Sequence, residues 1–113
     1  MSKYLMLAFT NPVPGKDAEY NDWYDNVAMP VYRTLPGLKP LGRYRLADIP
    51  KAFDFAMTSS WQYLSVYEFV TDGTPAAFLA KMKSIISNKK EYYFSEAIDK
   101  TSFFEPLFVS LDL

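Results

Sequence analysis

Hydrophobic and polar positions follow two different periods along this chain, and the first change comes at Asn11-Pro12. Before it, the apolar run at 3–10 is rich in strand formers and too short for a buried helix, so it predicts a central strand. From about Asp17, apolar residues recur every three or four positions, which predicts an amphipathic helix. The apolar stripe of this helix consists of Tyr20, Trp23, Tyr24, Val27 and Ala28. Pro30 lacks a backbone N–H, so the pattern predicts a kink there and a second short turn before Pro36-Gly37.

The rest of the chain is predicted to contain three further strands, one regular helix and one frayed helix. Segments 38–46 and 61–70 alternate in the manner of strands, and a long irregular connection at 48–60 joins them. Thr74 followed by Pro75 predicts the N-cap and first position of a helix. Segment 91–98 is interpreted as a frayed helix. The final strand at 103–111 is placed at a sheet edge, because Pro106 cannot donate a ladder hydrogen bond.

The order of these elements is strand, helix, strand, strand, helix, strand. That order predicts an α+β fold over residues 1–113, a single ferredoxin-like βαββαβ domain whose antiparallel sheet carries both helices on one face. The strands are apolar on both faces, as residues 4–9 illustrate, and helices can cover only one of them. A homodimer in which two sheets face each other would bury the second apolar face.

Composition narrows the possible functions. Nine Tyr, nine Phe and two Trp exceed what a small core needs, so some are expected to line a pocket or a subunit interface. The absence of Cys and His removes thiolate chemistry, the commonest general base and the commonest metal ligand, so neither a metal nor a cofactor is expected. A net charge of −1 argues against nucleic acid. The sequence has no apolar run of about 20 residues and no signal-peptide pattern. We therefore expect a cytoplasmic protein that does not associate with membranes.

Three runs of residues suggest a family: NPVPGKDAEYNDWYDNVAMPVYRTLPG, GRYRLADIP and YLSVYEFVTDGTPAAF. In this order, over nearly the whole chain, they resemble the dimeric α+β-barrel superfamily, and within it an uncharacterised branch near the EthD-like proteins. The resemblance implies a dimeric barrel but no particular reaction, because that superfamily includes cofactor-free monooxygenases, cyclases, dehydratases and proteins with no known reaction. The relatives' pattern N-x-W-Y-x-x-x-H-x-P maps onto Asn21, Trp23, Tyr24 and Pro30. Its His falls on Ala28, whose methyl group can neither exchange a proton nor bind a metal.

Four residues are candidates for catalysis. Tyr24, Asp25 or Glu68 could move a proton, and Arg43 could stabilise an oxyanion with its planar guanidinium. Each also has a structural interpretation. Tyr24 could pack the helix on the sheet, Asp25 could interact with the helix dipole and solvate its outer face, and Arg43 and Glu68 could form ion pairs.

The favoured hypothesis is a homodimer that binds a small apolar or aromatic molecule in a pocket between the sheet and the first helix. The expected lining residues are Tyr20, Trp23, Tyr24, Ala28, Tyr32, Tyr44 and Tyr67. One alternative is a cofactor-independent enzyme of the monooxygenase, cyclase or dehydratase type that acts on a phenolic or polyketide-like substrate. Another is a structural dimer that binds no ligand.

Overall fold

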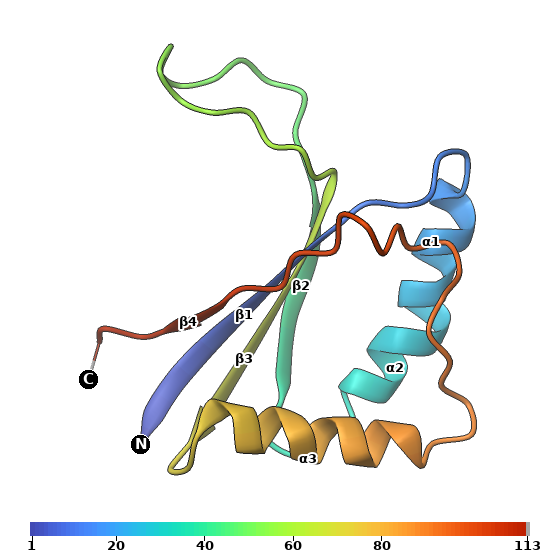
Figure 1. Ribbon diagram of the computed structural model, residues 1–113, viewed down its shortest axis with the longest axis vertical. Coiled ribbons are helices and arrows are strands. Elements are labelled where there is room, and N and C mark those ends of the chain that lie inside the picture. The colour runs from blue at the N-terminus through green and yellow to red at the C-terminus, as the bar shows by residue number, and fades with distance from the viewer. Residues whose placement is uncertain (113) are drawn as a thin grey trace.

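The computed structural model describes residues 1–112 and has an α+β fold, with helices to one side of a four-stranded antiparallel sheet (Figure 1). The strands are β1 (Ser2–Thr10), β2 (Lys39–Arg45), β3 (Tyr63–Thr71) and β4 (Leu107–Val109). Their order is β2-β3-β1-β4, with every neighbouring pair antiparallel. This arrangement is consistent with the ferredoxin-like expectation, and the short β4 lies at an edge as Pro106 predicts.

The first helical region passes through Pro30 without ending. It consists of α1 (Asp17–Trp23), a π-helical turn η1 (Tyr24–Ala28) and α2 (Met29–Tyr32). The N–H of Met29 donates to the carbonyl of Tyr24, the wider spacing of a π-helix. Because a proline ring clashes with the carbonyl four residues before it, a wide turn immediately ahead of Pro30 lets the chain stay helical. The irregularity expected at Pro30 takes the form of this wide turn, and the second short turn expected after it is α2.

The helix α3 (Pro75–Ser87) begins as the sequence predicts. The Thr74 hydroxyl accepts a hydrogen bond of 3.1 Å from the N–H of Ala77 and so caps the first turn. Phe78 stacks on Phe69 of β3 with ring centroids 4.1 Å apart, and Met82 one turn later is buried. These contacts hold one face of α3 toward the sheet.

The predicted frayed helix at 91–98 is wrong. The chain there is irregular and runs along the outside of α1 before it reaches β4 (Figure 1). Its backbone groups bond to distant segments instead of to one another: the Tyr93 carbonyl accepts 2.6 Å from the Trp23 indole, and the Ala97 carbonyl accepts 2.7 Å from the N–H of Val13. Tertiary partners have satisfied the groups that a helix would have paired internally.

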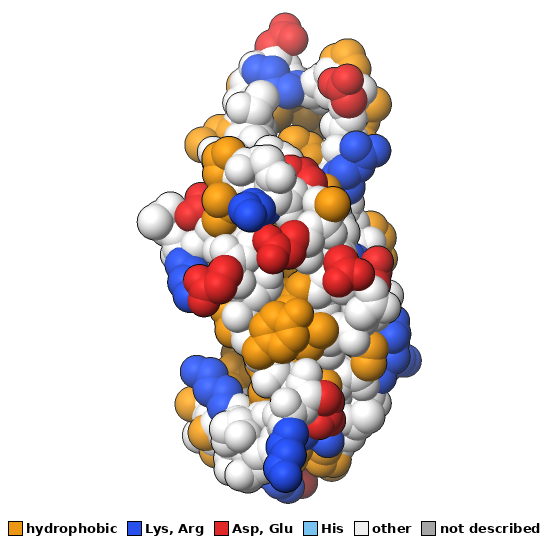
Figure 2. Space-filling model, turned by 90° about the vertical axis from the view of Figure 1, so that its right-hand side faces the viewer, with side chains coloured by type: hydrophobic (Ala, Val, Ile, Leu, Met, Phe, Trp, Pro, Cys, Tyr) orange, Lys and Arg blue, Asp and Glu red, His pale blue; other side chains and the backbone are white. Residues whose placement is uncertain are grey.

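The side of the molecule that carries the helices presents scattered acidic and basic side chains around a small apolar area (Figure 2). The connection between β2 and β3 projects away from the sheet as an arm, residues 47–61, with its base closed by a bond of 2.7 Å between the N–H of Leu46 and the carbonyl of Gln62 (Figure 1). The arm exposes Ile49, Phe53, Phe55 and Met57. Within residues 1–112, none of the helices has the length and apolar character required to cross a membrane.

Candidate functional site

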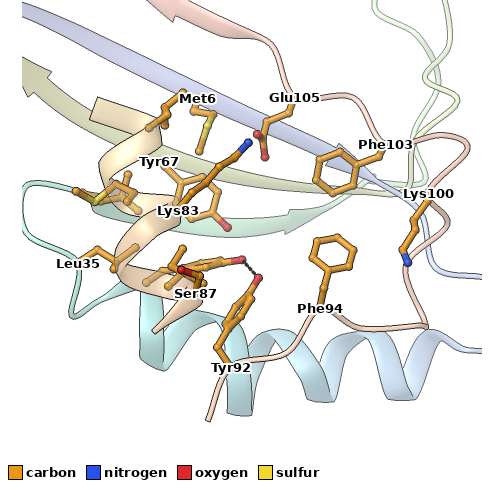
Figure 3. A pocket seen from close by; sticks show the side chains of 15 residues that line it. Met6, Leu35, Tyr67, Lys83, Ser87, Tyr92, Phe94, Lys100, Phe103 and Glu105 are labelled. Carbon is orange, nitrogen blue, oxygen red and sulfur yellow. Dashed lines mark hydrogen bonds between the residues drawn. The ribbon is translucent and has the colours of Figure 1, made fainter. Parts of the chain in front are cut away.

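A cavity of about 910 Å³ opens between α3, the helix-bearing face of the sheet and the segment that leads into β4 (Figure 3). This volume lies within the range of about 300–1,000 Å³ that is usual for small-molecule sites. Aliphatic and thioether side chains form much of its wall: Met6, Leu35, Leu38, Leu79, Met82 and Ile86. Aromatic side chains form the remainder of the apolar wall: Tyr32, Tyr67, Tyr92, Phe94 and Phe103. The polar lining is confined to Lys83, Ser87, Lys100 and Glu105.

Strand alternation explains why the sheet contributes Met6 and Tyr67 to the cavity. These residues are cross-strand partners in β1 and β3, so both side chains lie on the helix-bearing face. The Tyr67 ring makes an edge contact with Tyr32 of α2 at a centroid distance of 5.7 Å. The Tyr32 and Tyr92 hydroxyls share a hydrogen bond of 2.8 Å, which ties α2 to the segment after α3. The floor of the cavity is therefore fixed by aromatic packing and one polar contact.

The phenols that line the cavity remain uncharged at physiological pH. Burial raises the pKa of Tyr32, Tyr67 and Tyr92, because the phenolate form would lose its hydration. A neutral phenol can donate and accept hydrogen bonds but is a poor base. These hydroxyls are suited to orienting a ligand.

The charged groups of the cavity occur at its edges. Burial by the surrounding wall raises the pKa of the Glu105 carboxyl, and the positive charge of Lys83 acts in the opposite direction. In Figure 3 the Glu105 carboxyl and the Lys83 ammonium lie at the same edge. Lys100 lies over the Phe94 ring, with its ammonium 5.7 Å from the centroid, and contacts Glu96 at 4.0 Å.

A second polar cluster lies outside the cavity and joins three of the four catalytic candidates. The Arg43 guanidinium lies 4.2 Å from the Tyr24 ring centroid, donates 2.8 Å to the Asn21 side chain and contacts Asp25 at 3.3 Å. Burial also raises the pKa of Tyr24. The fourth candidate, Glu68, pairs across strands with Leu5 and Lys39 and so lies on the opposite face of the sheet. The cluster joins η1 to β2. The terminal nitrogens of Arg43 have acceptors in Asp25 and Asn21, whereas its buried Nε has none within residues 1–112.

The residues expected to line a pocket separate into three groups. Tyr32 and Tyr67 line the cavity. Tyr44 lies on the other face of the sheet and is 56% exposed. The remaining four are buried in the core between the first helical region and the sheet and do not line the cavity: Tyr20, Trp23, Tyr24 and Ala28. The fully buried Ala28 therefore leaves no opening for a ligand.

Sequence reasoning missed the lining residues contributed by the segment between α3 and β4. Tyr92 and Phe94 fall in the predicted frayed helix at 91–98, and Phe103 and Glu105 fall in the predicted final strand at 103–111. The observed β4 begins only at Leu107, so all four residues precede it. The only signal was the clustering of aromatics in an aperiodic segment, at 92–94 and 103–104. Apolar aromatic side chains are expected to pack against other apolar groups, and here they form the wall of the cavity opposite α3.

Comparison with known proteins finds no family model, no curated protein and no solved structure that matches this chain. The function is therefore inferred from the cavity and its residues.

Proposed function

We propose that this protein binds a small apolar or aromatic molecule in the cavity beside α3. The observation that carries the proposal is an open cavity of about 910 Å³ lined by aliphatic and aromatic side chains with a few polar groups at its edge. Ligand sites have this composition, since apolar walls supply affinity and a small number of polar groups fix orientation.

Binding is favoured over catalysis by the positions of the catalytic candidates. Tyr24, Asp25 and Arg43 form a cluster outside the cavity, and Glu68 lies on the opposite face of the sheet. A general base has to come within hydrogen-bond reach of its substrate. None of the four lines the space in which a substrate would sit.

A cavity-filling substitution tests the binding proposal. Leu79→Trp should place an indole in the cavity and weaken binding of the neutral dye Nile red by about tenfold or more, or about 1.4 kcal/mol. The matched control is Ala80→Trp, which adds the same side chain to the exposed side of α3. Dye fluorescence measures binding, and circular dichroism verifies the fold of each variant. If the native protein does not bind Nile red saturably, or if both variants bind it equally well, the proposal fails.

The same proposal includes a homodimer related to the dimeric α+β-barrel superfamily. Two features support it. The sheet order is consistent with a ferredoxin-like domain. The sheet face away from the helices carries apolar side chains with no helix over them, including Leu5, Leu7, Leu64 and Val66. On this proposal, pairing of two chains through that face would cover it and leave the cavity of each chain on the outside of the sheet pair.

A further inference from the structure

Tyr67 is the most deeply buried residue with a polar side chain in the wall of the cavity. It is 3% exposed, and its side chain extends from β3 into the cavity (Figure 3). The polar lining residues other than the tyrosines are all exposed: Lys83, Ser87, Lys100 and Glu105. Of residues 1–112, therefore, only phenols and apolar side chains line the inner part of the cavity.

The Tyr67 hydroxyl makes no hydrogen bond within residues 1–112, although the residue is buried. In this part of the chain, the Nε atom of Arg43 is the one fully enclosed side-chain polar atom that lacks a partner. The Tyr67 oxygen is therefore not enclosed but touches open space, and the space that Tyr67 lines is the cavity. Ser65, on the same face of β3, lies close enough to act on the pKa of Tyr67, but the two hydroxyls do not meet in a hydrogen bond.

The other two phenols of the cavity differ from Tyr67 because they are paired. The Tyr32 and Tyr92 hydroxyls share their hydrogen bond of 2.8 Å. The Tyr67 hydroxyl keeps its proton, since burial raises its pKa. It is thus a neutral donor that faces the cavity without an acceptor. Most buried polar groups in proteins have a hydrogen-bond partner, and here a ligand can supply it.

The surroundings of this hydroxyl restrict the chemistry of the ligand. A carbonyl oxygen accepts a hydrogen bond and brings no hydrogen of its own, so Tyr67 alone can satisfy it. A ligand hydroxyl would bring a second donor that needs an acceptor of its own. A ligand carboxylate would lose its hydration among apolar groups, because the cations of the lining, Lys83 and Lys100, are exposed.

We propose that the cavity binds a neutral, apolar carbonyl compound, such as an aryl ketone, whose oxygen accepts a hydrogen bond from the Tyr67 hydroxyl. This inference rests on the proposed function, because it specifies which group of the ligand the cavity recognises. The apolar body of the ligand contacts the aliphatic and thioether wall, in which Leu35 and Met82 are also buried.

Two probes of the same shape test the inference on the full chain: 2-acetylnaphthalene and 2-isopropenylnaphthalene, which differ in a C=O against a C=CH2 group. Equilibrium dialysis at neutral pH gives the dissociation constant of each. Tyr67→Phe removes the hydroxyl and keeps the ring. We expect the affinity ratio of ketone to alkene to fall about fivefold in this variant, or about 1 kcal/mol, the contribution of one neutral hydrogen bond. The ratio cancels the effects that both probes share.

Three further variants are controls. Tyr93→Phe removes an exposed hydroxyl that does not line the cavity, and Tyr92→Phe removes a paired one; both should keep the native ratio. Urea unfolding tests separately whether the Tyr67 hydroxyl is unpaired in the fold. Tyr67→Phe should keep the native midpoint, whereas Tyr20→Phe, which removes the buried bond to Thr10, should lower it.

The outcomes separate this inference from the proposed function. If both probes bind and Tyr67→Phe leaves the ratio unchanged, the cavity binds apolar molecules but Tyr67 does not recognise a carbonyl group. A ratio that falls in Tyr92→Phe instead would assign the carbonyl to the paired phenols and overturn the role of Tyr67. A midpoint that falls as far in Tyr67→Phe as in Tyr20→Phe would show that the hydroxyl is bonded within the fold, which also overturns the inference. If neither probe binds, the proposed function fails together with the inference.

Discussion

The polar groups of single residues differ between the core and the cavity. The Tyr20 hydroxyl is hydrogen-bonded to Thr10, both residues are fully buried, and the bond connects α1 to β1. The Tyr32 and Tyr92 hydroxyls bond to each other at the cavity floor. Glu105, in contrast, faces the cavity with no donor from residues 1–112. A phenol whose bond is internal stabilises the fold, whereas an unpaired carboxyl makes stability depend on pH.

The raised pKa of Glu105 predicts such a dependence. A carboxyl with a higher pKa in the folded chain binds more protons when folded, so the free energy of unfolding should fall as pH rises from its ordinary value of 4.5 through the raised pKa. Glu105→Gln should remove this decrease, and the exposed Glu96→Gln should retain it. Urea unfolding at a series of pH values provides the measurement. Equal slopes for the native protein and Glu105→Gln would show that Glu105 does not titrate in this way.

Among the elements, α3 contributes most directly to the proposed binding site. One face of this helix stacks Phe78 on Phe69 of β3, and the same face contributes Leu79, Met82 and Ile86 to the cavity wall. Because the cavity separates part of α3 from the sheet, the helix has fewer tertiary contacts to hold it than a fully packed helix. The capping interactions at its ends therefore contribute more to its stability than they would in a fully packed helix.

The N-cap of α3 is accordingly expected to be sensitive to substitution. Thr74→Ala removes the acceptor for the N–H of Ala77 and should lower the free energy of unfolding by about 1 kcal/mol. Thr58→Ala, on the exposed arm, is the matched control and should change it by less than about 0.5 kcal/mol. Urea denaturation followed by far-UV circular dichroism compares the two. A loss no greater than that of the control would mean that α3 does not depend on this cap.

The shape of the whole molecule is more extended than its length requires. The Cα radius of gyration is 15.4 Å, and a compact chain of this size is expected near about 13 Å. The arm projects from the sheet and lengthens the molecule (Figure 1). Apolar side chains are exposed on the arm and on β4, such as Phe55 at 85% and Phe108 at 53%. Exposed apolar area on this scale supports the proposed association between copies of the chain.

The proposed dimer leads to a prediction about the sheet face. Native mass spectrometry should detect an assembly of twice 13.0 kDa, and Val66→Lys should convert it to a monomer by placing a charge on the face without helices. Ala18→Lys, on the exposed surface of α1, should leave the dimer intact. A native protein that is monomeric at every concentration tested would contradict the proposed pairing.

The order of the elements follows from the sequence alone, because it depends on local signals. Each of these signals acts within a few residues, and the structure has the corresponding elements. They are the alternating runs of the strands, the helical stripe from Tyr20 to Ala28, the helix start at Thr74-Pro75, and Pro106, which places the last strand at an edge. The site depended on tertiary packing. An aromatic stripe predicts that its side chains are buried, but it does not show whether they pack against the sheet or line a pocket. In the structure, Trp23 and Tyr24 pack in the core.

One wall of the cavity is formed by the segment between α3 and β4, and the path of this segment was not predictable from local patterns. That segment takes its course from contacts far away in the sequence, such as those to the Trp23 indole and the N–H of Val13. Its path along α1 carries Tyr92, Phe94 and Glu105 to the open side of α3. Local patterns contain no information about such long-range partners, so the sequence determined the elements and tertiary structure determined where a ligand can bind.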